Sequence, residues 1–283
     1  MSGTAEVNGI KMHYLIEGNG PTAVLLHGWP QNSHCWRHIV GPLSQTHTVI
    51  APDLRGYGRT DKPVGGYDKR TMAADVRALV RHLTDDSPIT LVGHDRGARV
   101  AHRYALDHAE NVSRLAVLDI VPTREAWRRG NPKTGLCAVP WHWHFHLQRD
   151  LPELLVGPNI RGYLEYFFER WTFQRAGLDP AAVDEYVRSF SRPGALRAGF
   201  EDYRAGFPYD DDLDNADFDA GLGLSMPVLA LWGATGLPAQ LDVLDAWRPY
   251  APDLRGEAIP DCGHFIAEEQ PAALLAHLNA FAR

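Results

Sequence analysis

A carboxylate stands where the sequence predicts a sharp turn between a buried strand and a helix. The segment 89–99 reads ITLVGHDRGAR, an apolar run followed by a turn between Gly93 and Gly97 and by the start of a helical pattern, with Asp95 at the tip. This layout is typical of a nucleophile elbow. A carboxylate that attacks an sp³ carbon forms an ester and expels a leaving group. We therefore expect Asp95 to open a carbon–halogen bond or an epoxide.

Hydrolysis of such an ester requires a base and an acid that orients it. His264 is the candidate base, because it lies in the turn DCGHF at 261–265, between the last weak strand and the closing helix. The acid commonly follows the strand at 228–232, but the residues after that strand, GATGLP at 233–238, include no carboxylate. Asp119 ends the previous strand and is therefore the expected acid, in the chain order nucleophile, acid, histidine.

A turn that could stabilise negative charge follows the first apolar strand. The residues HGWP at 27–30 have the pattern of an oxyanion-hole turn. The backbone N–H groups of Trp29 and Arg96 are the expected donors to the charge that develops during ester hydrolysis.

Short apolar runs alternate with helical patterns over two parts of the chain. The runs lie at 23–26, 48–51, 89–92, 115–118, 228–232 and, more weakly, 255–259, and helical spacing occurs at 71–83 and 98–108. Continuous apolar runs are typical of parallel strands that are covered on both faces. With right-handed crossovers they predict an α/β fold with a mostly parallel, doubly wound sheet. Together with the elbow at Asp95, this sheet indicates an α/β-hydrolase fold.

The strand pattern stops between residues 122 and 215, where the sequence is aromatic and helical, with helices expected at 163–171 and 180–190. An insertion here would lie over the carboxyl ends of the strands, where open α/β sheets bind ligands. We therefore expect a hydrolase core at 1–121 and 216–283 and a helical cap at 122–215. The acidic run 210–212 is expected to be a solvated loop that returns to the core, not a metal site.

Composition excludes several classes of function. The chain has 283 residues and a formal net charge of -7, so it offers no basic stripe for nucleic acid, and an anionic substrate would need local cations. Its three cysteines, Cys35, Cys137 and Cys262, suggest neither a disulfide framework nor a zinc site. The first 20 residues lack the apolar core of a signal peptide, and no run reaches membrane-spanning length. We expect a cytoplasmic enzyme without a membrane partner.

Several longer stretches match the pattern of a known family. They read GHDRGAR at 93–99, ALDH at 105–108, LAVLDI at 115–120, WHWHF at 141–145 and DYRAG at 202–206. In these residues, and over nearly its whole length, the chain resembles the fluoroacetate (haloacetate) dehalogenase family. The segment DLRGYG at 53–58 resembles a segment of the whole superfamily and is less specific.

Arg96 and Arg99 stand one helical turn apart beside the nucleophile, where they would clamp a substrate carboxylate and keep Asp95 ionised. The resemblance further implies that His142, the indole N–H of Trp143 and the hydroxyl of Tyr203 receive the departing halide. Without it, residues 141–145 would be interpreted as an aromatic packing cluster. Trp171 aligns only loosely with the family and is not assigned a role.

The expected reaction has two steps and uses neither metal nor cofactor. Asp95 attacks the α-carbon of a small 2-haloacid and forms a glycolyl ester, and His264, oriented by Asp119, then activates water to release glycolate. The resemblance also suggests a homodimer. Two features depart from the family: Ala98 stands where glycine is frequent, and the Gly/Pro-containing stretch 130–140 is longer.

Three other functions fit parts of the pattern. An epoxide hydrolase shares the Asp nucleophile, the turn at 27–30 and the cap, but it needs two cap tyrosines, and the possible companions of Tyr203 are Tyr163, Tyr166 and Tyr186. A ligand-binding protein with a hydrolase fold would have lost turnover, whereas all three catalytic positions are present here. An esterase is disfavoured because Asp95 replaces the serine.

Overall fold

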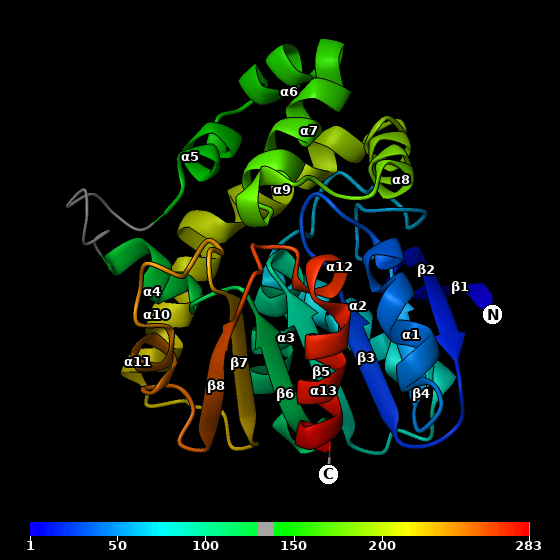
Figure 1. Ribbon diagram of the computed structural model, residues 1–283, viewed down its shortest axis with the longest axis vertical. Coiled ribbons are helices and arrows are strands. Elements are labelled where there is room, and N and C mark those ends of the chain that lie inside the picture. The colour runs from blue at the N-terminus through cyan, green and yellow to red at the C-terminus, as the bar shows by residue number, and fades with distance from the viewer. Residues whose placement is uncertain (130–138, 283) are drawn as a thin grey trace.

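A single sheet of eight strands lies at the centre of the computed structural model, which describes residues 1–129 and 139–282 (Figure 1). The strands follow the order β1-β2-β4-β3-β5-β6-β7-β8. Their bounds are β1 (Ser2–Val7), β2 (Ile10–Glu17), β3 (Thr22–Leu26), β4 (Thr48–Pro52), β5 (Ile89–His94), β6 (Val112–Leu118), β7 (Val228–Gly233) and β8 (Leu254–Ile259). Neighbouring strands from β4 to β8 pair in parallel, as the sequence predicts.

The strands β1 and β2 are an addition that the sequence analysis did not predict. They pair with each other antiparallel, and β2 pairs antiparallel with β4, so they extend one edge of the sheet. Exposed and buried residues alternate along β1, which is the pattern of an edge strand with one solvated face.

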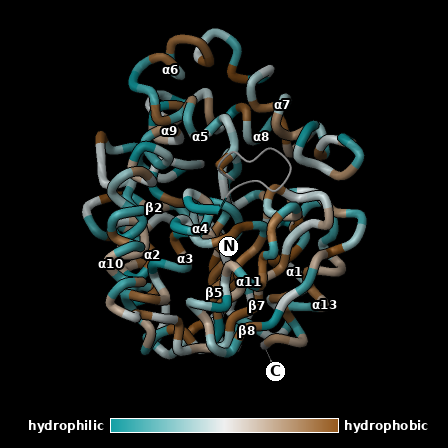
Figure 2. Tube along the Cα trace, turned by 90° about the vertical axis from the view of Figure 1, so that its left-hand side faces the viewer, coloured by the Kyte–Doolittle hydropathy of each residue, from teal (hydrophilic) through white to brown (hydrophobic). Residues whose placement is uncertain are grey.

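Helices cover both faces of the sheet. Figures 1 and 2 place α2 and α3 on one face and α1 and α13 on the other. The helices of the core are α1 (Arg37–Leu43), α2 (Lys69–Leu83), α3 (Arg96–Asp107), α11 (Val243–Trp247), α12 (Ile266–Glu269) and α13 (Pro271–Ala282), with short 3₁₀ turns η1 (Ser33–Trp36) and η2 (Ala109–Asn111). Both faces of the parallel strands are therefore shielded from water.

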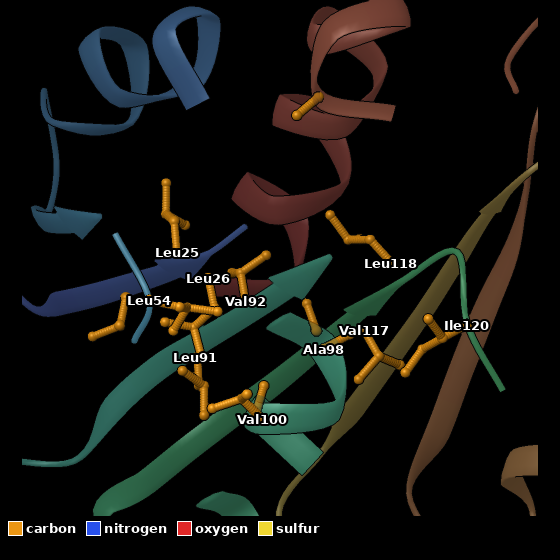
Figure 3. Close-up of a cluster of buried hydrophobic side chains, with 14 of the residues drawn as sticks. Leu25, Leu26, Leu54, Leu91, Val92, Ala98, Val100, Val117, Leu118 and Ile120 are labelled. Carbon is orange, nitrogen blue, oxygen red and sulfur yellow. The ribbon is translucent and has the colours of Figure 1, made fainter. Parts of the chain in front are cut away.

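The interior around β5 is apolar and fully buried. Figure 3 shows Leu91 and Val92 of β5 among leucines and valines of the neighbouring strands, next to Ala98 and Val100 of α3. Each of these four side chains is at most 1% exposed. Burial of a leucine or valine side chain contributes about 1.5–3 kcal/mol. This packing fixes the strand and the helix on either side of the turn at Asp95.

The chain between β6 and β7, for which a cap is expected, is helical. Its helices are α4 (Thr123–Arg128), α5 (Trp141–Leu147), α6 (Leu151–Val156), α7 (Ile160–Arg170), α8 (Pro180–Phe190), α9 (Ala195–Ala205) and α10 (Asp211–Asp219), with 3₁₀ turns η3 (Gly157–Asn159) and η4 (Phe173–Arg175) and the π turn η5 (Gly206–Asp210). Figure 1 shows α5 to α9 above the sheet. Trp171 follows α7 in this region, and its ring centroid lies 5.1 Å from that of His264 in the loop after β8. The helices between β6 and β7 therefore contact the sheet at the carboxyl ends of its strands. Most of the long stretch 130–140 lies outside the described residues.

The acidic run 210–212 is not the solvated loop that the sequence suggested. It completes η5 and begins α10, so the expected boundary at residue 215 falls inside a helix. Asp210 accepts a hydrogen bond from the backbone N–H of Lys69 at 2.9 Å, and Asp211 lies 3.3 Å from Arg128. Nζ of Lys69 also lies 3.5 Å from Oδ2 of Asp210. The cations Lys69 and Arg128 thus neutralise carboxylates that also favour the start of a helix. The partners are remote in sequence, so the charge run alone did not reveal them.

Candidate active site

The turn after β5 holds Asp95 in an unusual backbone conformation. Its φ is 47° and its ψ is -119°. Such a conformation costs of order 1–3 kcal/mol in a residue other than glycine. The flanking glycines make it sterically possible, because a Cβ on Gly97 would lie 2.2 Å from the carbonyl oxygen of His27, and a Cβ on Gly93 would lie 2.5 Å from the Cα of Ala98. The segment therefore forms the predicted elbow, with the carboxylate at its tip.

The expected oxyanion turn lies against this carboxylate. The backbone N–H of Trp29 donates to Oδ2 of Asp95 at 3.0 Å. Arg96 is the first residue of α3, where a backbone N–H has no acceptor within its own helix. Oδ1 of Asp95 has no hydrogen bond within the described residues, so one carboxylate oxygen is held and the other is free to attack.

The structure brings His264 and Asp119 together. Nδ1 of His264 lies 2.6 Å from Oδ2 of Asp119, although the two residues are 145 positions apart. Asp119 also accepts hydrogen bonds from the backbone N–H groups of Gly233 at 3.0 Å and Leu237 at 3.1 Å. Residues 233–238 have no carboxylate of their own, and their backbone thus binds the carboxylate of Asp119, which directly follows β6. Nε2 of His264 is buried and has no partner within residues 1–129 and 139–282.

Electrostatics in the site favour an ionised nucleophile. Burial works against the charged form of Asp95, but positive charge at His264, Arg96 and Arg99 outweighs it, so the pKa of Asp95 is lowered. Burial also opposes protonation of His264, but the hydrogen bond and charge of Asp119 raise the pKa of this imidazole. A carboxylate anion beside a basic imidazole suits attack on carbon followed by activation of water.

Both predicted arginines are buried next to the nucleophile, but they make different contacts. Nε and Nη2 of Arg96 donate to Oδ1 of Asp202, at 2.9 and 2.7 Å. Nη1 of Arg99 donates to Oγ1 of Thr123 at 2.9 Å. One edge of Arg96 is therefore engaged by a carboxylate, which the expected two-arginine clamp did not foresee.

The three expected halide donors are buried side by side, with His142 and Tyr203 against the indole of Trp29 and Trp143 next to Tyr203. His142, Trp143 and Tyr203 are 2%, 6% and 3% exposed. The ring of Tyr203 lies 5.7 Å from that of His142 and 5.9 Å from that of Trp143, and Trp29 lies 6.0 Å from His142 and 5.8 Å from Tyr203. Within the described part of the chain, the His142 ring nitrogens, the Trp143 indole N–H and the Tyr203 hydroxyl have no hydrogen-bond partner. Trp171, which was left unassigned, lies 4.9 Å from His142.

A small cavity opens beside the nucleophile. Its volume is about 40 Å³, and its lining residues are Asp95, Arg99, Asp119, Ile120, Val121, Ala126, Pro140, Trp143, Leu237, Pro238 and Leu241. About 10–15 Å³ measured in this way holds one water molecule. The cavity therefore has room for a ligand of a few heavy atoms, next to the carboxylates of Asp95 and Asp119 and the guanidinium of Arg99.

Two further site residues were not predicted, although both lie inside the matched stretches. Asp202 contacts Arg96, and Nε2 of His94 lies 2.8 Å from the carbonyl oxygen of His264. Burial lowers the pKa of His94 to about 3, so its imidazole is neutral and can donate this hydrogen bond. His94 thus ties the loop of the candidate base to the elbow. In the sequence, only the position of His94 next to Asp95 indicated that it could belong to the site.

The described residues contain no cluster of three or more His, Cys, Asp or Glu side chains that could hold a metal ion. Cys35 and Cys262 are buried free thiols, and Cys137 lies outside these residues. Among the described helices none is long and apolar enough to cross a membrane.

Comparison with known proteins decides the family. A family model described as the alpha/beta hydrolase fold matches residues 21–271. The chain belongs to the alpha/beta hydrolase family. Within it, the chain is 38% identical over 276 residues to a soluble epoxide hydrolase of Corynebacterium sp. (strain C12), covering 94% of this chain and 92% of the relative.

A second similar alpha/beta hydrolase is a fluoroacetate dehalogenase of Burkholderia sp., 36% identical over 274 residues, which cover 94% of this chain and 88% of the relative. The solved structure of the epoxide hydrolase CorEH without ligand superposes with a TM-score of 0.91 at 36% identity, covering 99% of this chain and 98% of that one. The family and the fold are thus established, and the two relatives carry the names of different hydrolases, an epoxide hydrolase and a fluoroacetate dehalogenase.

Proposed function

We propose that this alpha/beta hydrolase is a haloacetate dehalogenase, which converts small 2-haloacids such as fluoroacetate into 2-hydroxy acids through an ester on Asp95. The observation that carries this proposal is the cavity in which the nucleophile faces Arg99, a guanidinium with no carboxylate partner in the described residues. A substrate with its own carboxylate would supply the missing anion.

The first step is attack by Asp95 on the α-carbon. The N–H of Trp29 holds Oδ2, so Oδ1 forms the new carbon–oxygen bond while the carbon–halogen bond breaks and the halide leaves with its electron pair. A fluoride leaving group needs several preorganised donors. The N–H of Trp143, the hydroxyl of Tyr203 and a ring N–H of His142 supply them.

Burial, followed by the nearby His146, lowers the pKa of His142 well below its usual range, so its ring is neutral and carries a single N–H. Burial also raises the pKa of Tyr203, with the charge of Asp95 adding to the effect. The Tyr203 hydroxyl therefore keeps its proton at neutral pH and can donate it to the halide.

The second step hydrolyses the ester. Nε2 of His264 takes a proton from water, whose oxygen bonds to Cγ of Asp95. Negative charge develops on Oδ2, which faces the N–H of Trp29, and the N–H of Arg96 is the second proposed donor. The ester bond then breaks and the glycolate oxygen takes up the proton from His264. One water oxygen remains in the Asp95 carboxyl, which releases the second proton of the water to solvent and so returns to the carboxylate. Asp119 fixes the tautomer by accepting a hydrogen bond from the Nδ1–H of His264.

We further propose, from the resemblance to the fluoroacetate dehalogenase family, that the enzyme works as a cytoplasmic homodimer without cofactor or metal. The small haloacid would be its only partner, and neither nucleic acid nor a membrane would take part.

Epoxide hydrolysis is the second candidate, because a relative at 38% identity carries that name. Against it, the expected companions of Tyr203 are engaged or remote. The Tyr163 hydroxyl lies 2.7 Å from Nε2 of His146, the Tyr186 hydroxyl donates to Glu268, and Tyr166 is 38% exposed. Of these three tyrosines, Tyr163 and Tyr186 thus have hydroxyls that are already hydrogen-bonded, and Tyr166 lies at the surface of the cap. This arrangement supports the haloacid over the epoxide.

Product analysis separates the candidates. Halide release from fluoro-, chloro- and bromoacetate is measured with ion-selective electrodes, and diol formation from styrene oxide is measured by chromatography with the same enzyme. We expect glycolate and halide in equal amounts and little diol. Diol formation without halide release would favour the epoxide hydrolase, and ligand binding without either product would favour a binding protein.

A further inference from the structure

A single carboxylate holds the backbone on both sides of the candidate base. Glu269, the last residue of α12, accepts a hydrogen bond from the N–H of Gly263 at 2.9 Å through Oε2 and one from the N–H of Phe265 at 2.8 Å through Oε1. Gly263 and Phe265 flank His264 in the chain. A shift of this loop would therefore weaken hydrogen bonds that the charge of Glu269 strengthens.

The same carboxylate reaches the cap. Oε2 of Glu269 also accepts a hydrogen bond from the backbone N–H of Phe173, at 2.7 Å. Beside it, the N–H of His264 donates to the carbonyl oxygen of Trp171 at 2.7 Å. A Cβ on Gly263 would lie 2.1 Å from that oxygen, so glycine permits this close approach. Backbone contacts therefore join the cap segment 171–173 to the loop of the base.

This junction also sets the place of Trp171. Its ring centroid lies 5.1 Å from that of His264 and 4.9 Å from that of His142. Trp171 thus contacts both the candidate base and one of the proposed halide donors. The contacts that hold segment 171–173 against the loop therefore also hold the base relative to the halide donors.

The neighbouring Glu268 binds different groups. Its Oε1 accepts hydrogen bonds from Nη1 of Arg37 at 2.7 Å and from the hydroxyl of Tyr186 on α8. Its carboxylate has no hydrogen bond to residues 261–265 in the described part of the chain. Two adjacent carboxylates thus link the core to the cap, and of these two only Glu269 holds the loop of the base.

The charge of Glu269 also acts on the imidazole of His264. Burial lowers the pKa of His264, but Asp119, and then the charges of Asp95 and Glu269, raise it. Two neutral imidazoles lie nearby, those of His94 and His142, because burial lowers the pKa of each. Removal of the charge of Glu269 should therefore lower the pKa of His264.

We propose that Glu269 is a positioning residue for ester hydrolysis, whose carboxylate holds His264 and the cap segment 171–173 in place beside the ester on Asp95. This inference rests on the ester step of the proposed function and does not depend on the leaving group. Glu269 acts through His264, whereas the attack of Asp95 uses donors that Glu269 does not contact. Loss of Glu269 should therefore slow the second step and spare the first.

Single turnovers with bromoacetate and excess enzyme test this division. Rapid quenching and intact-mass measurement follow the formation of the ester and its decay, and the amount of ester formed counts the folded sites. An amide has one acceptor oxygen, so Glu269→Gln leaves at least one backbone N–H facing an NH₂ group. We expect it to slow ester decay roughly 10- to 100-fold, because a misplacement of about 1 Å can cost 100-fold, and to leave ester formation near the wild-type rate.

The adjacent Glu268→Gln is the matched control, because it breaks the other link between core and cap. We expect it to leave both steps near the wild-type rates. A slower decay in Glu268→Gln equal to that in Glu269→Gln would show that any loosening of the cap suffices, and would overturn the proposal. Equal slowing of both steps by Glu269→Gln, or an unchanged ester decay, would overturn it as well.

A measurement without substrate distinguishes a positioning role from a general loss of stability. The imidazole of His264 is titrated by nitrogen NMR of isotope-labelled protein, with His264→Asn identifying its signal. We expect a lower pKa of His264 in Glu269→Gln than in the wild type, and values near the wild type in Glu268→Gln and in Glu269→Asp, which keeps the charge. A pKa of His264 that Glu269→Gln leaves unchanged would contradict the proposal.

The choice of substrate separates this inference from the proposed function. If the wild type forms no ester and releases no halide with bromoacetate, the proposed reaction fails, and the same variants are then compared with styrene oxide. An ester from the epoxide that decays slowly in Glu269→Gln, but not in Glu268→Gln, would preserve the role of Glu269. Equal decay in the wild type and both variants would refute that role.

Discussion

Replacement of the candidate base, His264→Asn, should split the reaction into its two steps. The first step needs only Asp95 and the halide donors, so each site should release one halide and then stop. The second step needs a base, and a positioned base contributes typically 10²- to 10⁴-fold. Steady turnover should therefore fall by at least about 100-fold, while the ester accumulates on Asp95.

The expected loss lies toward the upper end of that range, because the two titratable groups described next to the site, His94 and Glu269, are already engaged. The nearest imidazole, His94, has a pKa lowered by burial to about 3, and its Nε2 is bound to the carbonyl oxygen of His264. The nearby Glu269 accepts hydrogen bonds from the backbone N–H groups of Phe173 at 2.7 Å and Gly263 at 2.9 Å, so its carboxylate is also engaged.

The assay mixes a known concentration of active sites with excess bromoacetate, records halide by stopped flow, and measures the intact mass of the protein at the plateau. Asp95→Asn is the control and should show neither halide nor added mass. Continuous release of many halides per site by His264→Asn, at a rate near that of the wild type, would refute the assignment of the base.

Three further results are expected. Tyr203→Phe removes one donor to the halide and should lower kcat for fluoroacetate by roughly 10²-fold, with a smaller loss for bromoacetate, whose leaving group needs less help; equal losses would argue against halide contact. Ester hydrolysis needs neutral His264, whose pKa is raised above its usual 6.5, so steady turnover should fall as the pH drops through a value above 6.5. The halide burst needs only ionised Asp95, whose pKa is lowered, so the burst should persist to lower pH. A burst that disappears together with turnover would contradict this. Gly97→Ala places a Cβ 2.2 Å from a backbone oxygen and should cost at least about 1–3 kcal/mol of unfolding free energy, measured in urea; an unchanged midpoint would show that the elbow has more room.

Sequence patterns predicted the parts of this protein that depend on local information. The apolar run at β5, the glycines around Asp95 and the helical pattern after it are all contained within a dozen residues, and the structure has the elbow there. The same holds for α8, which begins at Pro180 with Asp179 as its cap. Asp119 was found by elimination, because no carboxylate followed β7.

Contacts between remote residues could not be predicted in this way. Asp202 binds Arg96, which is 106 positions away, and Asp210 binds Lys69 across 141 positions. A carboxylate in a sequence looks the same whether it meets solvent or a buried cation, so the run 210–212 was assigned to a solvated loop. The antiparallel edge formed by β1 and β2 was also missed, although the alternation at 1–20 carried a signal for it.

The measurement that tests the central claim most directly is a single turnover in heavy-oxygen water with enzyme in excess over chloroacetate. Hydrolysis of an ester on Asp95 predicts that the label enters the Asp95 carboxylate, detectable by mass spectrometry of the peptide that contains it, and that the first glycolate formed is unlabelled. Label found in glycolate, with Asp95 unlabelled, would show direct attack of water on the substrate and would contradict the account.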